Sequence, residues 1–421
     1  MFTQTIPTEI WRVVLAHAIR DPYRLKTEWD FEPEDDLWIP WTHQNRESQE
    51  ELDDQRLLHR TRFRTGLTII RVCRTWRALA IGFVYEYFEL RWGSDGDGEE
   101  VRESMQQAID LFESTAALHT DRRGYGRWTK RIDVELQIIE DEDTRRILLR
   151  LLSHCHSLAV LSIFDPNHTM YPDIEDEAMQ SISQTIELRF YHSFRRLDST
   201  FTPAYVPAVP LQSLDIWLPP EQDILPPKIV LESVTTLTIT ISLESSTQLR
   251  SSSWYFPRLR HLGLVDYYWK GGAIPALTAF VQRHAALVTS ISFSSWDYSD
   301  ILCPGLHSVI EIAPRLTSLT IRDLDLTSFP QRSVHRSITH VAIIGAYVRS
   351  DPAVISGPLW ALNSGLFPAM QCLRLAIRDP VATCHRYEEL VSLCEKLGVR
   401  LEDGDNQRLV AQTHEEGSIG E

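Results

Sequence analysis

A short hydrophobic pattern recurs along most of the 421-residue chain, from residue 132 onward. Leu158-x-x-Leu161-x-Ile163 is one copy, and its alternation of apolar and other residues predicts a strand with one buried face. In register, the copies recur every 22–32 residues, a period typical of solenoids whose neighbouring strands bury that face together. The other copies are Ile132–Leu136, Ile186–Phe190, Leu211–Ile216, Leu237–Ile241, Leu259–Leu264, Ile291–Phe293, Leu316–Ile321, Ile338–Ile343 and Met370–Leu375.

Between the predicted strands lie segments with helical spacing of apolar residues: Thr144–Leu152, Pro275–Leu287, Gly305–Ala313 and Tyr387–Leu397. A strand followed by a helix, repeated, predicts an α/β fold: a curved parallel sheet with helices on its outer side. We assign residues 100–402 to this irregular solenoid. Val399–Leu401 is its last expected strand, and residues 403–421 form a loose polar tail.

Residues 1–92 show a helical pattern instead. A first helix is expected after Pro7, with apolar residues at helical spacing, and it ends at Asp21-Pro22. A second helical stretch starts near Thr65, and its apolar stripe has Arg71, Arg74 and Arg77 on the opposite side. Residues 22–64 between them are acidic and rich in tryptophan, which predicts an insertion loop.

Three motifs in this region, IPTEIW, VCRTWRALA and YEYFEL, resemble the F-box of fungal proteins. The repeats resemble the leucine-rich repeats that follow an F-box in many such proteins, although the asparagine that ends their strand consensus is missing. The resemblance implies a helical hairpin that binds a Skp-family adaptor of a cullin-type ubiquitin ligase. Carried over position by position, the adaptor-binding residues are Ile6, Pro7, Ile10, Trp11, Val72, Cys73, Trp76 and Leu79.

Charge and composition exclude several classes of partner. The net charge is −16 without a cluster of Lys and Arg, so neither nucleic acid nor an anionic membrane is expected. No apolar run is long enough to cross a bilayer, and the N-terminus lacks a signal peptide. The six cysteines lack the spacing of a disulfide framework, which favours reduced thiols and a cytoplasmic or nuclear protein.

The sequence shows no clear catalytic or metal-binding motif. His154-Cys155-His156 has no second ligand pair at a zinc-like distance, and the glycine-rich loop at residues 93–98 lacks the Lys-Ser/Thr of a phosphate-binding loop. We therefore expect no enzyme activity, no cofactor and no metal.

Aromatic and charged residues follow several predicted strands, where they would gather along one rim of the sheet. Trp, Tyr and Arg are enriched in binding hot spots, so this rim is the predicted site for a protein substrate. The candidate residues are Trp217, Asp266, Tyr267, Trp269, Trp296, Tyr298, Arg322 and Arg374.

Three hypotheses about function follow. The first is a substrate receptor of an SCF-type ubiquitin ligase, and the second is an interaction scaffold whose N-terminal helices only cap the solenoid. The third, an enzyme, would need a deep pocket with converging titratable groups. Exposure separates the first two: a receptor should expose Pro7, Ile10, Val72 and Trp76 as one apolar patch, whereas a cap should bury them against the first repeats.

Overall fold

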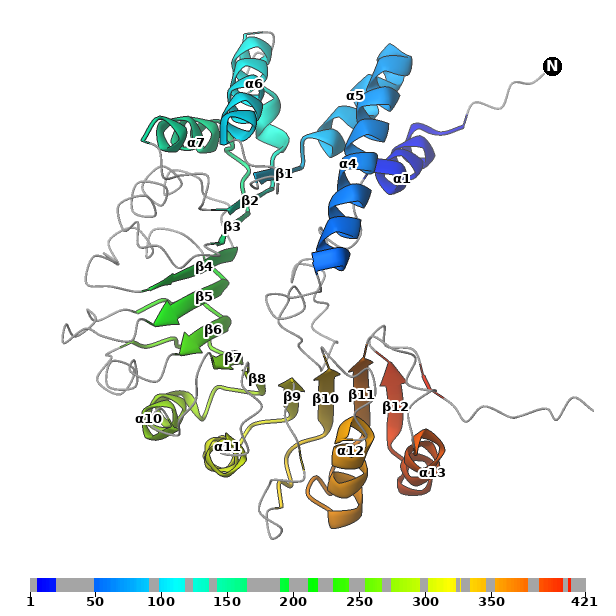
Figure 1. Ribbon diagram of the computed structural model, residues 1–421, viewed down its shortest axis with the longest axis vertical. Helices are drawn as coiled ribbons and strands as arrows, with labels where there is room; N and C mark the ends of the chain where they lie inside the picture. Colours follow the sequence, from blue (N-terminus) through cyan, green and yellow to red (C-terminus); the bar gives the residue numbers. More distant parts are fainter. Residues whose placement is uncertain are drawn as a thin grey trace, which may run out of the picture.

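The computed structural model describes residues 6–19, 49–90, 98–117, 124–135, 142–164, 190–196, 211–218, 230–241, 254–266, 274–295, 302–322, 326, 334–345, 353–377, 386–403 and 408–409. Within these residues one parallel sheet of twelve strands runs through the molecule, and each strand pairs with the next in the sequence. The strands follow one another along an arc (Figure 1). The predicted solenoid of parallel strands is therefore confirmed.

The strands come at regular intervals, and ten of the twelve overlap a predicted copy. They are β1 (Tyr87–Leu90), β2 (Arg131–Glu135), β3 (Val160–Phe164), β4 (Phe190–Arg196), β5 (Ser213–Leu218), β6 (Thr236–Ile241), β7 (His261–Asp266), β8 (Ser290–Ser295), β9 (Ser318–Arg322), β10 (His340–Gly345), β11 (Cys372–Ile377) and β12 (Arg400–Asp403).

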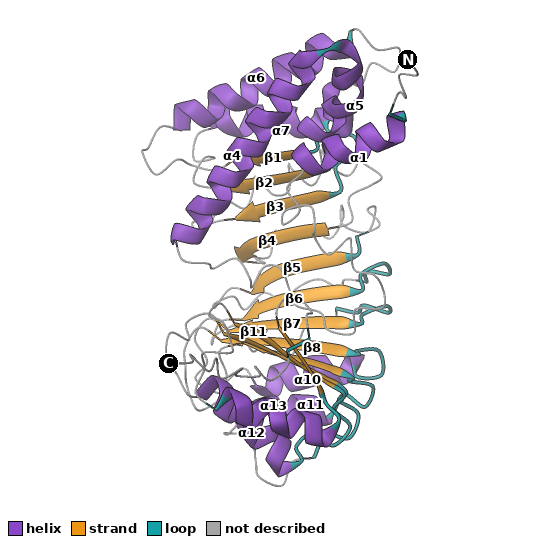
Figure 2. Ribbon diagram, turned by 90° about the vertical axis from the view of Figure 1, so that its right-hand side faces the viewer, coloured by secondary structure: helices purple, strands orange, loops and turns teal. Residues whose placement is uncertain are grey.

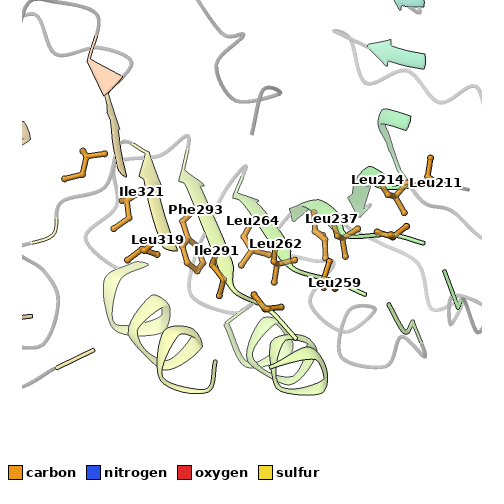
Figure 3. Packing of buried hydrophobic residues seen from close by; sticks show 14 of the residues in the cluster. Leu211, Leu214, Leu237, Leu259, Leu262, Leu264, Ile291, Phe293, Leu319 and Ile321 are labelled. Atoms are coloured by element: carbon orange, nitrogen blue, oxygen red, sulfur yellow. The ribbon is translucent and has the colours of Figure 1, made fainter. Parts of the chain in front are cut away.

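One row of side chains from these strands forms the core. Leu237, Leu262, Ile291 and Leu319 occupy matching register positions on β6 to β9 and are fully buried. Figure 3 shows this row, with Leu264 and its neighbours, between the strands and the helices beneath them. Burying a leucine of this kind stabilises the fold by about 1.5–3 kcal/mol, so the repeated apolar row holds the strands in register.

Helices lie in two groups, one at each end of the array (Figure 2). The first group comprises α1 (Thr8–Ile19), α4 (Gln49–Val72), α5 (Arg74–Val84), α6 (Gly98–Ala116) and α7 (Glu142–His154). The second comprises α10 (Ile274–His284), α11 (Leu302–Glu311), α12 (Ala353–Ser364) and α13 (Tyr387–Leu397). The four predicted helices of the array correspond to α7, α10, α11 and α13. A short 3-10 turn at Tyr125–Trp128 precedes β2.

Threonines just before several strands donate hydroxyl hydrogen bonds at the N-terminal ends of those strands, whereas the missing asparagine would lie at the opposite, C-terminal ends. The carbonyl oxygen of Thr289 accepts from the backbone N–H groups of Thr317 and Ser318, at 2.9 and 3.1 Å, and from the Thr317 hydroxyl at 3.2 Å. Thr339 binds the Thr317 carbonyl in the same way. Thr235 and Thr289 repeat the hydroxyl contact further up the array. We call Thr235, Thr289, Thr317 and Thr339 the threonine ladder; their hydroxyls add to the backbone hydrogen bonds at the starts of β6, β8, β9 and β10.

Two expectations about the array were wrong. The copy at Ile186–Phe190 is out of register, because Tyr191, not Phe190, pairs with the core positions Leu161 and Leu214. Its mixed aromatic and polar sequence alternates almost equally well in either register. The sheet also begins earlier than residue 100. β1 pairs with β2, so the strand that ends the N-terminal region is the first strand of the solenoid.

The N-terminal helices also differ from the expectation. The second helix begins at Gln49 instead of near Thr65, so the end of the predicted insertion loop is helical. Residues 49–64 hold no proline or glycine and are rich in Glu, Gln, Leu and Arg, which favour helix. The helix then breaks at Cys73, which caps α5. Residues 22–48 lie outside the described residues. So does most of the tail, apart from an antiparallel bridge between Arg408 and Glu402.

Candidate functional site

The three N-terminal helices form a small unit at the start of the array. α1 buries Leu15 and Ile19 against α4 and α5, and the Trp11 and Trp76 rings lie 5.3 Å apart at the α1–α5 contact. Gly66 lets α4 come close, because a Cβ there would lie 2.9 Å from a methyl of Val84. The unit therefore has a packed core of its own, which fixes the outward faces of its helices.

Helix α1 is apolar on two sides. At 100° per residue, Ile10 and Val13 lie roughly opposite the buried Leu15 and Ile19, and the exposed Ile6 precedes the helix. Ile10 is 53% exposed and Val13 56% exposed, and Val14 beside them is also exposed. A helix that is apolar around most of its circumference is normally buried on every side. The outer face of α1 thus has the composition of an interface that the isolated chain leaves uncovered.

The junction between α4 and α5 exposes a further apolar residue. Val72, the last residue of α4, is 59% exposed. Next to it, the exposed Cys73 accepts a hydrogen bond from the Trp76 backbone N–H at 3.4 Å, and so holds the start of α5. The Arg77 Nε donates to the Ile70 carbonyl at 3.1 Å across the junction. The bend is therefore fixed, and Val72 remains outside the core.

We call the exposed apolar residues of these helices the N-terminal patch: Ile6, Pro7, Ile10, Val13, Val14 and Val72. Four of the eight residues expected to bind the adaptor belong to it, and Cys73 lies at its edge. The other three are half-buried: Trp76 and Leu79 pack against the core, and Trp11 lies against Trp76. Val13 was missed because α1 has apolar residues on two faces. In such a helix the spacing of apolar residues does not show which face is buried.

The predicted substrate rim is only partly described. Tyr267, Trp269, Trp296 and Tyr298 lie outside the described residues, as do the side chains of Trp217, Asp266 and Arg322. The backbones of these last three lie at the ends of β5, β7 and β9. The strand register places Trp217 and Arg322 in one row of the sheet and Asp266 in the adjacent row.

Arg374, the remaining rim candidate, is not available on a surface. It is 7% exposed, and its guanidinium donates to the Glu402 carboxylate at 2.9 and 3.2 Å. Burial alone would raise the pKa of Glu402, but hydrogen bonds from Arg374 and Cys372 and the charge of Arg400 lower it. This ion pair joins β11 to β12 on the sheet face that points away from the core row. A rim contact through Arg374 would require breaking it.

The same sheet face is buried along the later strands. Ser290, Ser292, Ser318, Thr320 and Ala342 alternate with the core residues of β8 to β10, and each is at most 3% exposed. Small neutral side chains therefore line this face, and in the free chain they are closed to solvent. The N-terminal patch differs from this face because its side chains are apolar and exposed to solvent.

The three buried thiols do not suggest covalent chemistry, and the sulfur of the exposed Cys73 caps α5. Cys155 is fully buried, and burial raises its pKa to about 12. Burial likewise raises the pKa of Cys372 to about 11 and of Cys394 to about 12. Such thiols stay protonated at neutral pH and are poor nucleophiles. In the described part of the chain we find no cluster of three His, Cys, Asp or Glu side chains that could hold a metal ion. No helix there combines the length and apolarity needed to span a bilayer.

No protein-family model and no curated protein matches the sequence. Among solved structures, the leucine-rich repeat-containing protein LegL7 of Legionella pneumophila aligns with a TM-score of 0.39 at 13% identity, over 77% of this chain and 92% of that protein. A chain from the complex of Rad7 and Elc1 in yeast aligns with a TM-score of 0.27 at 10% identity, over 68% of this chain and 85% of that one. Both likenesses are too distant to carry an argument about function.

Proposed function

We propose that this protein is the substrate-recognition subunit of an SCF-type ubiquitin ligase. In this proposal the N-terminal patch binds a Skp-family adaptor, which links the chain to the cullin scaffold, and the repeat array holds a target protein. The chain performs no covalent step itself. It raises the local concentration of the target near the ubiquitin-carrying partner.

The exposure of the N-terminal patch is the observation that carries the proposal. A receptor and a simple solenoid cap make opposite predictions for Pro7, Ile10 and Val72, and all three are exposed. Trp76 is half-buried against Trp11, so it fits the receptor prediction only in part. An uncovered apolar surface built on a fixed helical core is typical of a protein-binding site.

An interaction scaffold without a ligase remains the second candidate. The long sequential sheet is suited to binding a protein whether or not a ligase is involved. The scaffold hypothesis assigns no partner to the N-terminal patch, so a test of adaptor binding separates the two.

The test is a pull-down of the intact chain with a purified Skp-family adaptor. The variant Ile10→Asp/Val72→Asp places two carboxylates on the patch at positions that are already more than half exposed, so folding should be preserved. Val334→Asp is the matched control, because Val334 is 52% exposed but lies in the repeat array. Thermal melts of all three proteins establish that they are folded.

We expect the intact chain and Val334→Asp to retain the adaptor, and the double variant to lose it. If the intact chain fails to retain the adaptor, or if the folded double variant binds as well as the intact chain, the receptor function is wrong. The scaffold function then takes its place.

A further inference from the structure

The arginines of the N-terminal unit surround the N-terminal patch. Over residues 6–19 and 61–85 the chain has six arginines and one carboxylate, Glu9, which is six minus one, a net charge of +5. The rest of the chain, at −16 minus 5, therefore has a net charge of −21. The expectation that basic residues do not cluster is thus wrong for residues 61–85, which alone contain five of the six arginines and no Asp or Glu.

Five of these arginines are exposed: Arg12, Arg64, Arg71, Arg74 and Arg77. Arg71 and Arg74 directly flank the Val72–Cys73 bend, and Arg64 lies two turns before it on the same side of α4. Arg12 reaches from α1 toward α5, with its guanidinium carbon 6.0 Å from the centre of the Phe83 ring. The exposed apolar residues thus have a rim of positive charge.

The exposed arginines of residues 61–85 differ from those of the repeat array in their contacts with carboxylates. Arg64, Arg71 and Arg74 take part in none of the ion pairs of the described residues, and residues 61–85 contain neither Asp nor Glu. By contrast, Arg131, Arg150 and Arg386 in the array each contact a carboxylate within 3 Å. The uncompensated charge is therefore a local feature of residues 61–85, since the preceding part of α4, residues 49–60, contains four carboxylates.

Resting on the function proposed above, we infer that the N-terminal patch docks into an apolar groove of the adaptor bordered by Asp and Glu side chains. The arginines of the rim, Arg71 and Arg74 above all, pair with those carboxylates and steer association. Guanidinium groups bind carboxylates in a bidentate manner, and both segments contain arginine and no lysine. Charges at the rim of an interface change mainly the association rate and its salt dependence.

An anionic membrane fits these observations less well than an acidic protein. The exposed apolar residues are Ile, Val and Pro, whereas helices that lie on membranes present Trp, Phe and Leu beside lysines. In addition, the net charge of −21 on the rest of the chain repels an extended polyanionic surface. A protein groove with acidic residues only at its edge avoids that repulsion.

The test measures association kinetics of the full chain with a purified Skp-family adaptor at about 0.01 M and about 0.15 M salt, where the Debye length is about 30 and about 8 Å. Arg71→Glu/Arg74→Glu reverses the rim. Arg258→Glu/Arg336→Glu makes the same change in net charge at two exposed arginines of the repeat array and is the matched control. Val72→Ser reports on the apolar contact alone, and thermal melts establish folding.

For the rim variant we expect an association rate about tenfold or more slower at low salt, and a flattened salt dependence. The control should stay within about twofold of the intact chain, and Val72→Ser should raise the dissociation rate without changing the salt dependence. If the intact chain binds and the rim variant behaves like the control, the acidic groove is wrong and the receptor function stands. If the intact chain does not bind, both are wrong. Arginine-dependent binding to phosphatidylserine vesicles, with adaptor kinetics unaffected, would also overturn the inference.

Discussion

The threonine ladder allows the contribution of a side-chain hydrogen bond to be measured separately from the packing of the strands. Thr317→Val keeps the shape and β-branching of the side chain and removes only the hydroxyl that donates to the Thr289 carbonyl at 3.2 Å. A typical intramolecular hydrogen bond contributes about 0.5–1.5 kcal/mol. The Thr289 carbonyl keeps two N–H donors, and Thr317 is exposed, so we expect a loss near the lower limit, about 0.5–1 kcal/mol.

The assay is native-state hydrogen exchange, because a solenoid opens locally and a single melting temperature averages over its repeats. The amides of Thr317 and Ser318 should exchange faster in Thr317→Val, and the loss should roughly double in Thr317→Val/Thr339→Val. Thr75→Val, at an exposed threonine of α5, is the control. Equal protection of the wild type and the double variant would refute the idea that the threonine hydroxyls stabilise the starts of the strands.

Three further predictions test other parts of the structure. Burial lowers the pKa of His335 to about 4. The neutral side chain therefore contributes fully to stability above pH 6.5, and this contribution falls by up to about 3 kcal/mol as the pH drops to 4. The free energy of unfolding of His335→Gln should depend less on pH than that of the wild type. Gly66→Ala should destabilise the N-terminal helices by about 1–3 kcal/mol and weaken adaptor binding, whereas Gly82→Ala, whose Cβ would meet its nearest neighbour at 3.4 Å, should be tolerated in thermal melts. Arg374→Met should cost about 3 kcal/mol in chemical denaturation by leaving Glu402 with one arginine fewer, and an unchanged midpoint would contradict a structural role for this pair.

The array was predictable from the sequence because its pattern is periodic and local. The alternation of apolar residues at Leu259–Leu264 correctly predicts both the strand and its buried face, and the same holds for most copies. The prediction was wrong at β4, where the sequence permits two registers, and it missed α12, whose Pro358 lies inside the helix. Helix propensity disfavours such a proline, and the tertiary packing of buried residues such as Leu359 overrides it.

The N-terminal unit was less predictable, because its surface depends on how three helices pack. The motif indicated Ile10 and Val72, but only coordinates show that α1 buries Leu15 while leaving Val13 exposed. The positive rim was missed for a different reason: four of its five arginines lie in residues 61–85, which contain no Asp or Glu, and only the net charge of the whole chain was considered. A net charge of −16 suggests an acidic surface everywhere, whereas folding places Arg12 beside α5, which has no acidic side chain.

Hydrogen exchange of the full chain, with and without a purified Skp-family adaptor, tests the receptor function most directly. The account predicts that the adaptor slows exchange in α1 and around the Val72–Cys73 bend and leaves β7 to β11 unchanged, because the N-terminal patch lies only on the first helices. Slower exchange confined to the repeat array, or no change in any segment, would contradict it.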